Sequence, residues 1–240
     1  MSLPRTNRER AILEEISDGE NSHVEFKRKF TSHEKIAREL IAFANTHGGR
    51  LFIGIDDDHS VVGVKSEKEE IAMIEHACEF YCDPPIEPRI EIVEVFGKDV
   101  IIVNVPESHE KPHWLVEQND SNEARQAFIR LNDKTVAASK EVIRVMRINR
   151  PDAPPLTLVI GRLERTLFEY LRVNERITVK EFKKLVNVSE RRASTILVRL
   201  VRAGTLHLHT FEKDEFFSFA ADPDAAPRHA HKGGNGTHNE

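Results

Sequence analysis

The stretch Glu39–Asp58, ELIAFANTHGGRLFIGIDDD, decides the fold. Its first seven residues place apolar side chains at helical spacing, and the Gly48-Gly49 pair then ends that helix. The run Leu51–Ile55 follows at once and has the length and composition of a buried strand. A helix that passes directly into a buried strand predicts a domain in which helices and strands are mixed.

Hydrophobic periodicity outward from this stretch predicts more elements of both kinds. Helices are expected over residues 7–17, 32–45 (with Ser32 as N-cap), 67–81 and 139–146. Strands are expected over 23–30, 51–55, 89–95, 100–105 and 127–131, with 61–64 as the hairpin partner of 51–55. Because hairpins are interspersed with helices, the predicted fold class is α+β and not a doubly wound parallel sheet.

Charge divides the chain at the linker Pro151–Pro155. Residues 1–150 carry 21 basic and 28 acidic side chains, whereas residues 155–210 carry 11 and 5. We therefore predict an acidic domain over 1–150, a linker over 151–155, a basic domain over 156–219 and a disordered tail over 220–240. The basic domain indicates a polyanionic partner such as nucleic acid, although a solvated helix face would have the same charges.

Composition also excludes some classes of protein. With 39% hydrophobic and 31% charged residues, the 240-residue chain can bury a core and is not a disordered protein. The N-terminal residues lack an apolar leader, and no run reaches the ~18 apolar residues of a membrane span. We expect a cytoplasmic protein without a membrane partner. Cys78 and Cys82 are too few for a disulfide framework and are expected to be two small residues of one helix.

The basic domain has the element order of a winged helix-turn-helix. Helices are expected over 158–173, 179–186 after a Thr178 cap, and 189–201 after a Ser189 cap, followed by a β-wing over 206–219. The third helix would be the recognition helix. The side chains expected to contact bases or phosphates are Lys183, Lys184, Arg191, Arg192, Ser194, Thr195 and Arg199. The alternative is that these helices form a dimer or partner interface.

Four charged residues form a candidate catalytic group: Glu20, Glu25, Lys27 and Asp56. Glu25 and Lys27 are two apart on a strand and share a face, while Asp56 follows the next strand. Carboxylates at Glu20, Glu25 and Asp56 could hold Mg²⁺ or Mn²⁺, and a lysine could steady the charge that develops on a phosphate. Solvated strand and turn charges would have the same spacing.

The segment Asn45–Gly49 allows two interpretations. Two glycines after a helix permit close backbone approach by a phosphate. They equally suit a helix C-terminus that turns tightly into a strand.

Five blocks together resemble the Schlafen AlbA_2 domain: VEFK (24–27), ELIAFANTHGGRLFIGIDDD (39–58), VVGV (61–64), VIIVNVPESHEKPHW (100–114) and AFIRLNDKTVAAS (127–139). The resemblance spans about Asp18 to Met146. It implies an α+β domain, often followed by a winged helix, in a nucleic-acid-binding transcriptional regulator. A subset related to the Schlafen proteins cleaves structured RNA such as tRNA with two glutamates and an aspartate.

By motif position those carboxylates are Glu20, Glu25 and Asp56. Lys111, His113 and Arg130 fall at family-like positions and are expected to contact phosphate, and Arg50 is a further candidate nucleic-acid contact. The alternatives are that Arg130 is a surface residue without such a role and that Pro112 only fixes a turn. The stretch 19–22 lacks the family's usual Glu-Ser pair, and RLNDKT replaces its more common Arg-Val-Gly form.

Two functional hypotheses follow. The first is a DNA-binding transcriptional regulator that docks through the winged helix. The second is a Mg²⁺- or Mn²⁺-dependent endonuclease that cleaves structured RNA. A third possibility is that the first domain has lost catalysis and binds partner proteins. The sequence leaves open whether the protein is an enzyme, and we expect a homo-oligomer.

Overall fold

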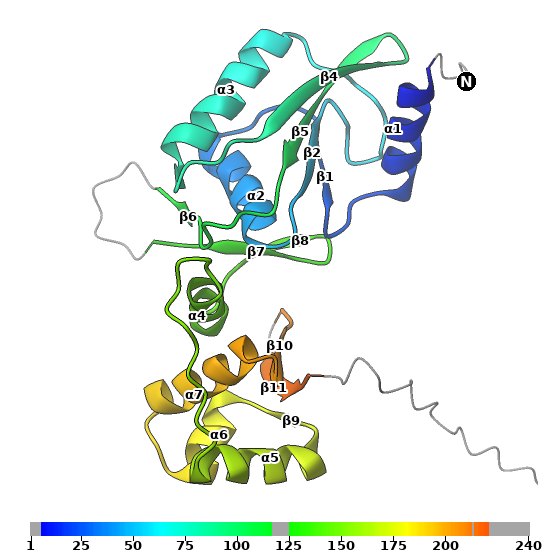
Figure 1. Cartoon of the computed structure of the whole chain (residues 1–240). Coiled ribbons are helices and arrows are strands. Elements are labelled where there is room, and N and C mark those ends of the chain that lie inside the picture. The colour runs from blue at the N-terminus through cyan, green and yellow to red at the C-terminus, as the bar shows by residue number, and fades with distance from the viewer. Residues whose placement is uncertain (1–5, 117–124, 213, 221–240) are drawn as a thin grey trace, which may run out of the picture.

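The computed structural model describes residues 6–116, 125–212 and 214–220. Its main sheet has the strand order β1-β2-β5-β4 (Figure 1). These strands are β1 (Val24–Lys27), β2 (Gly49–Ile53), β4 (Arg89–Val95) and β5 (Lys98–Val105). β1 runs parallel to β2, and the other two pairs are antiparallel. The strand β1 therefore forms one edge of this sheet.

Helices cover both faces of the main sheet (Figure 1). Alternate side chains of a strand point to opposite faces, so each strand contributes to two cores. On one face α1 (Asn7–Asp18) packs against Phe26 and Phe52. On the other face α2 (His33–Asn45) and α3 (Glu67–Phe80) form a second core with residues such as Leu51. Ser32 caps α2, as the sequence predicts.

Smaller elements complete this region. β3 (Cys82–Asp83) pairs with β6 (Trp114–Leu115), and β7 (Phe128–Leu131) forms a hairpin with β8 (Lys134–Ala137) that packs on α2. The helix α4 (Lys140–Ile148) follows. The mixture of helices, hairpins and small sheets confirms the α+β class.

The C-terminal region has its own core. Its elements are α5 (Arg162–Asn174), β9 (Arg176–Ile177), α6 (Val179–Val186), α7 (Glu190–Arg202), β10 (Leu206–Thr210) and β11 (Glu215–Phe219). The strands form a sheet of order β10-β11-β9. Apolar residues of all three helices surround Phe182 and Phe217, which are fully buried. Thr178 and Ser189 cap α6 and α7, as predicted.

The predicted hairpin partner of β2 is wrong. Within residues 61–64, only Val61 forms a β-bridge, which is antiparallel and opposite Ile55. The strand β2 itself pairs with β1 and β5. The N–H groups of Val62 and Gly63 both donate to the carbonyl of Gly54. A Cβ atom at Gly54 would come within 3.1 Å of the Gly63 Cα, so the chain folds tightly onto Gly54 and does not extend.

The helix predicted from Leu158 starts later, at Arg162. The Glu164 carboxylate accepts a hydrogen bond of 2.9 Å from the Gly161 N–H, which fixes the first turn there. Cys82 likewise lies beyond the end of α3, in β3, and both cysteines are buried free thiols. The tail over 220–240 falls, apart from Ala220, outside the described residues.

Candidate nucleic-acid interface

A buried arginine organises the polar face of β1. The Arg130 side chain comes from β7, is 0% exposed, and donates to Glu25 of β1 at 2.9 Å and to Glu39 of α2 at 3.0 Å. Its other terminal nitrogen donates to the carbonyls of Asn21 (2.8 Å) and Asp133 (3.0 Å). The predicted polar face is therefore not solvated but is covered by α2 and the β7–β8 hairpin.

Glu39 is the residue of this group that sequence reasoning missed. Its carboxylate accepts from the Thr135 hydroxyl at 2.5 Å as well as from Arg130. Burial raises the pKa of Glu39, and the negative charge of Glu25 raises it further. The available signal was a carboxylate that directly precedes the apolar run 40–44 of the same helix.

Asn45, the last residue of α2, and Thr46 after it link α2 to neighbouring segments of the domain by hydrogen bonds. The Asn45 amide donates to the carbonyls of His113 and Phe128, both at 3.0 Å, and its oxygen accepts from the His113 N–H at 2.8 Å. The Thr46 hydroxyl accepts from the Arg130 N–H at 2.9 Å. Asn45 and Thr46 thus satisfy buried backbone groups of β7 and of the loop before β6.

The two glycines that follow are required by the chain itself. A Cβ atom on Gly48 would come within 2.7 Å of the Val105 carbonyl, and Gly48 has a φ of 75°. A Cβ atom on Gly49 would overlap the Phe43 ring at 2.2 Å. Of the two interpretations of this segment, the tight turn from helix to strand accounts for both glycines without a ligand.

The three candidate metal ligands have other partners. The Glu20 carboxylate accepts a hydrogen bond of 2.9 Å from the Phe26 N–H, a backbone donor on the edge of β1 that has no neighbouring strand. Glu25 pairs with Lys27 and Arg130, and Asp56 pairs with Arg28. Within 6–116, 125–212 and 214–220, no three His, Cys, Asp or Glu side chains form a group that could hold a metal ion. In this arrangement the three carboxylates are therefore engaged by protein partners.

Three further predicted phosphate contacts of this region are also occupied. Arg50 pairs with Glu15 and donates to the Asn104 amide oxygen at 3.1 Å. Lys111 donates to the Thr46 carbonyl at 2.6 Å and to Glu107 at 2.5 Å. His113 is 3% exposed, and its ring contacts the Pro84 carbonyl and the Ser108 hydroxyl, both at 2.7 Å. Burial lowers the pKa of His113, which favours its neutral form.

The predicted recognition helix has one covered face. Ser194 of α7 is 1% exposed and donates to Glu141 of α4 at 2.9 Å. Arg144 of α4 donates to the same hydroxyl. Ser194 therefore cannot reach a base edge in this arrangement, because α4 lies against it (Figure 1).

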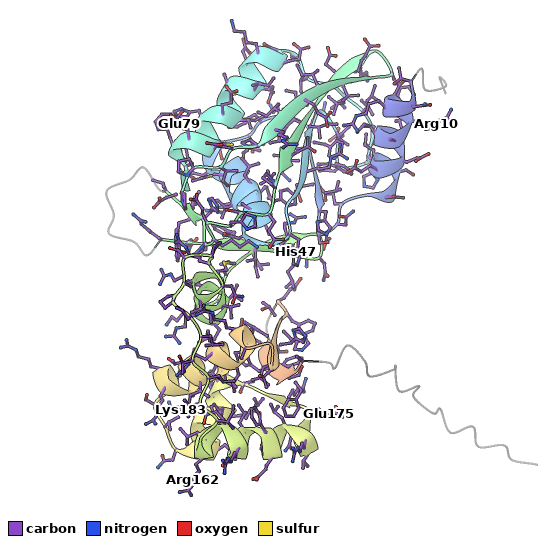
Figure 2. The ribbon with its side chains drawn as sticks, viewed as in Figure 1. Arg10, His47, Glu79, Arg162, Glu175 and Lys183 are labelled. Atoms are coloured by element: carbon purple, nitrogen blue, oxygen red, sulfur yellow. The ribbon has the colours of Figure 1, made fainter. Side chains whose placement is uncertain are left out.

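The other face of α7 and the neighbouring α6 are open. The residues that remain exposed are Lys183, Lys184, Arg191, Arg192, Thr195 and Arg199. Lys183 lies at the outer surface of the C-terminal region (Figure 2) and 3.5 Å from Glu190. The Arg199 guanidinium donates to the Thr157 carbonyl at 2.5 Å. Among the described residues, the side chains of Lys184, Arg191 and Arg192 have no carboxylate partner.

The class of this protein follows from these observations. The fold is an α+β domain with a buried arginine that pairs with two carboxylates. This domain is joined to a basic helical region with a β-hairpin. The sequence profile of the family described as Schlafen, AlbA_2 matches residues 20–139, which is half of the chain. The chain belongs to this family.

Two solved structures show further similarity. The first is the solution NMR structure of the N-terminal domain of a RecG-related protein from Nitrosomonas europaea, which is 20% identical with a TM-score of 0.40. That alignment covers 64% of this chain and 95% of the other. The second is the crystal structure of the DIP2311 protein from Corynebacterium diphtheriae, which is 17% identical with a TM-score of 0.47. It covers 87% of this chain but only 37% of the other.

No helix within the described part of the chain is long and apolar enough to cross a membrane.

Proposed function

We propose that this protein binds nucleic acid through α6 and the open face of α7, and that it acts as a DNA-binding transcriptional regulator. The observation that carries the proposal is the set of exposed cations on these helices that lack carboxylate partners: Lys184, Arg191 and Arg192. A cation that is not neutralised within the protein is available to replace the counterions of a phosphate backbone.

The element order of the C-terminal region supports a winged-helix assignment. Three helices are followed by the β10–β11 hairpin, and β9 lies between the first and second helices. In such domains the third helix enters the major groove. Arg191, Arg192 and Thr195 lie near the N-terminal end of α7, which is the part of a recognition helix that approaches base edges. The resemblance to nucleic-acid-binding members of the family points the same way.

The test compares two triple variants in duplex DNA binding as a function of salt concentration. The first, Lys184→Ala/Arg191→Ala/Arg192→Ala, removes cations without partners. The matched control, Arg8→Ala/Arg28→Ala/Arg125→Ala, removes exposed cations that pair with Glu91, Asp56 and Asp83. The first variant should weaken binding and reduce the salt slope by about one unit per residue, and the control should not. Equal effects of the two would contradict this interface.

A second candidate function is a Schlafen-type endonuclease that acts on structured RNA. The observation that favours it is that Glu25 and Lys27 share one face of β1, while Asp56 follows the adjacent β2. In this arrangement Arg28 pairs with Asp56, and Arg130 pairs with Glu25. Cleavage would therefore require both carboxylates to leave their arginine partners.

Asp56→Asn is the sharper test of that candidate. Glu25→Ala would leave the buried Arg130 with one carboxylate fewer and would confuse unfolding with loss of catalysis. Asp56→Asn removes only a pair with the exposed Arg28. Labelled tRNA should be cleaved with Mn²⁺ and not with EDTA, and Asp56→Asn should abolish the cleavage. Cleavage that persists in Asp56→Asn would contradict this candidate.

A further inference from the structure

The sheet of the C-terminal region has two different faces. Residues that lie directly opposite each other in antiparallel strands point to the same face. One face carries Leu206 and Phe217, which belong to the core of this region. The other, which we call the outer face, carries six side chains: Arg176, His207, His209, Phe211, Phe216 and Ser218. Large aromatic side chains thus lie on the side of the sheet that the core does not use.

Three rings of the outer face form a stack. The His209 and Phe216 rings lie opposite each other in neighbouring strands, with centroids 4.8 Å apart and planes 20° from parallel. The Phe211 ring stacks on the Phe216 ring at 5.7 Å and 16°. A cross-strand pair such as His209–Phe216 stabilises a hairpin without any ligand. Phe211 is 56% exposed, however, so its ring offers a surface on which a further planar group can stack.

A cation accompanies these rings. The Arg176 guanidinium lies 5.3 Å from the centroid of the Phe216 ring, and no carboxylate within the described part of the chain pairs with it. Of the three carboxylates of the hairpin, Glu215 belongs to the opposite face, and Glu212 pairs with the first region. Asp214 is the third. Stacked rings beside an unpaired guanidinium are the combination by which proteins hold the bases and phosphates of single-stranded nucleic acid.

The hairpin is held against the first region (Figure 1). Glu212 pairs with Lys134 of β8, and the Ser139 hydroxyl donates to the Glu215 carboxylate at 2.7 Å. Leu208, on the face opposite the rings, lines a pocket together with residues of α4. The face that meets α4 is therefore the one without the rings, and the stack is carried by an anchored backbone. A binding surface that is already fixed loses less conformational entropy when a ligand binds.

We infer that the outer face binds single-stranded DNA, with an unpaired base stacked on the exposed ring of Phe211. In a duplex the faces of the bases are stacked on one another inside the helix, so only a strand with unpaired bases can use this ring. The outer face is separate from α6 and α7, and its ligand differs from the duplex proposed for those helices. The choice of DNA over RNA rests on the proposed function, because stacking and charge act on groups that both nucleic acids share.

The first test measures the affinity of the full-length chain for single-stranded oligonucleotides by fluorescence anisotropy. Two strands of equal length are compared, oligodeoxythymidine and an abasic strand that has the same phosphates but no bases. Phe211→Leu keeps an apolar side chain and removes the ring. It should therefore lower the affinity for oligodeoxythymidine by about fivefold or more and leave the affinity for the abasic strand unchanged.

The matched control for this test is Phe80→Leu on α3, since Phe80 is an exposed phenylalanine (50%) of the first region. The control should change the affinity for neither strand. Equal affinity of the wild type for the two strands, or equal effects of the two variants, would overturn the inference.

The second test separates this inference from the proposed duplex interface. Phe211→Leu should leave the affinity for duplex DNA unchanged. Lys184→Ala/Arg191→Ala/Arg192→Ala should weaken duplex binding but keep the preference for oligodeoxythymidine over the abasic strand. A triple variant with wild-type duplex affinity would refute the duplex interface alone, and loss of duplex affinity in Phe211→Leu would refute a surface specific for unpaired bases. Tighter binding of oligouridine RNA than of oligodeoxythymidine would overturn the choice of DNA.

Discussion

The buried Arg130 of the first region and the exposed basic residues of α6 and α7 in the C-terminal region have opposite environments. In the first region the Arg130 side chain is fully buried and donates to two carboxylates. The other lysine and arginine side chains of this region with carboxylate partners are Arg8, Lys27, Arg28, Arg50, Lys111, Arg125, Lys134, Arg144 and Arg150. In the C-terminal region most of the basic side chains of α5, α6 and α7 are exposed, and Lys183–Glu190 is an isolated pair 3.5 Å long. Arg130 thus belongs to the packed interior of the fold, whereas the exposed cations of α6 and α7 remain available to a partner.

This contrast shows that the number of basic residues is a poor guide to an interface. Arg130 and Arg192 are the same residue type, yet one is 0% exposed and the other lies on an open helix face. A buried guanidinium with carboxylate partners contributes to stability only as part of its group, because removing one partner leaves the others uncompensated. The exposed guanidinium contributes little to stability and can contribute to binding.

The largest effect expected from this contrast is that of Arg130→Met. The variant leaves Glu25 and Glu39 buried without their shared cation, and the free energy of unfolding should fall by about 3–5 kcal/mol. Arg192→Met should change it by no more than about 0.5 kcal/mol. Chemical denaturation of both variants measures the difference, and equal losses would show that the buried group does not stabilise the first region.

Asn45→Ala should have the next largest effect. Three hydrogen bonds to buried backbone groups of His113 and Phe128 would be lost, which should cost about 3 kcal/mol. Asn174→Ala in the C-terminal region is the matched control, because its amide makes one exposed bond to the Tyr170 carbonyl. The control should cost less than about 1 kcal/mol. A smaller loss of unfolding free energy for Asn45→Ala than for Asn174→Ala would show that the Asn45 hydrogen bonds do not stabilise this region.

Ser194→Ala tests the contact between α4 of the first region and α7 of the C-terminal region. The hydroxyl bonds Glu141 and Arg144 of α4, so its removal should lower the free energy of unfolding by about 1 kcal/mol. DNA affinity should stay unchanged, because Ser194 is covered by α4. The neighbouring exposed Thr195→Ala should show the reverse pattern, with little change in stability and weaker binding. Weaker binding by Ser194→Ala at unchanged stability would restore it as a base contact.

The last expected effect is a pH dependence of stability that arises from Glu39. Its pKa is raised in the folded protein by burial and by Glu25, so the folded state binds this proton more tightly than the unfolded chain. The stabilisation is complete below the ordinary value of 4.5 and is lost as pH rises through the raised pKa. The stability of the wild type relative to Glu39→Gln should therefore fall above pH 4.5, by about 1.4 kcal/mol per pKa unit. Urea denaturation across that range measures it, and parallel profiles would contradict the raised pKa.

Elements with long apolar periods were predictable from sequence because their spacing alone determines which face is buried. The helix after Ser32, the strand Leu51–Ile53 and the C-terminal helices α6 and α7 lie where the periodicity places them. Short strands such as β3, β6 and β9 were not predictable, because two residues are too few to show a hydrophobic periodicity. Their pairing depends on segments that are distant in the chain.

By itself, the sequence determined the α+β class, the acidic charge of residues 1–150, the basic charge of residues 155–210, and the family. These properties depend on composition, hydrophobic periodicity and local motifs. Only the tertiary structure decided what each charged residue does. Arg130 meets Glu25 across 105 residues and Ser194 meets Glu141 across 53. Burial and pairing at such separations arise from the packing of whole elements, and so local sequence cannot distinguish a charge within a core from one offered to a partner.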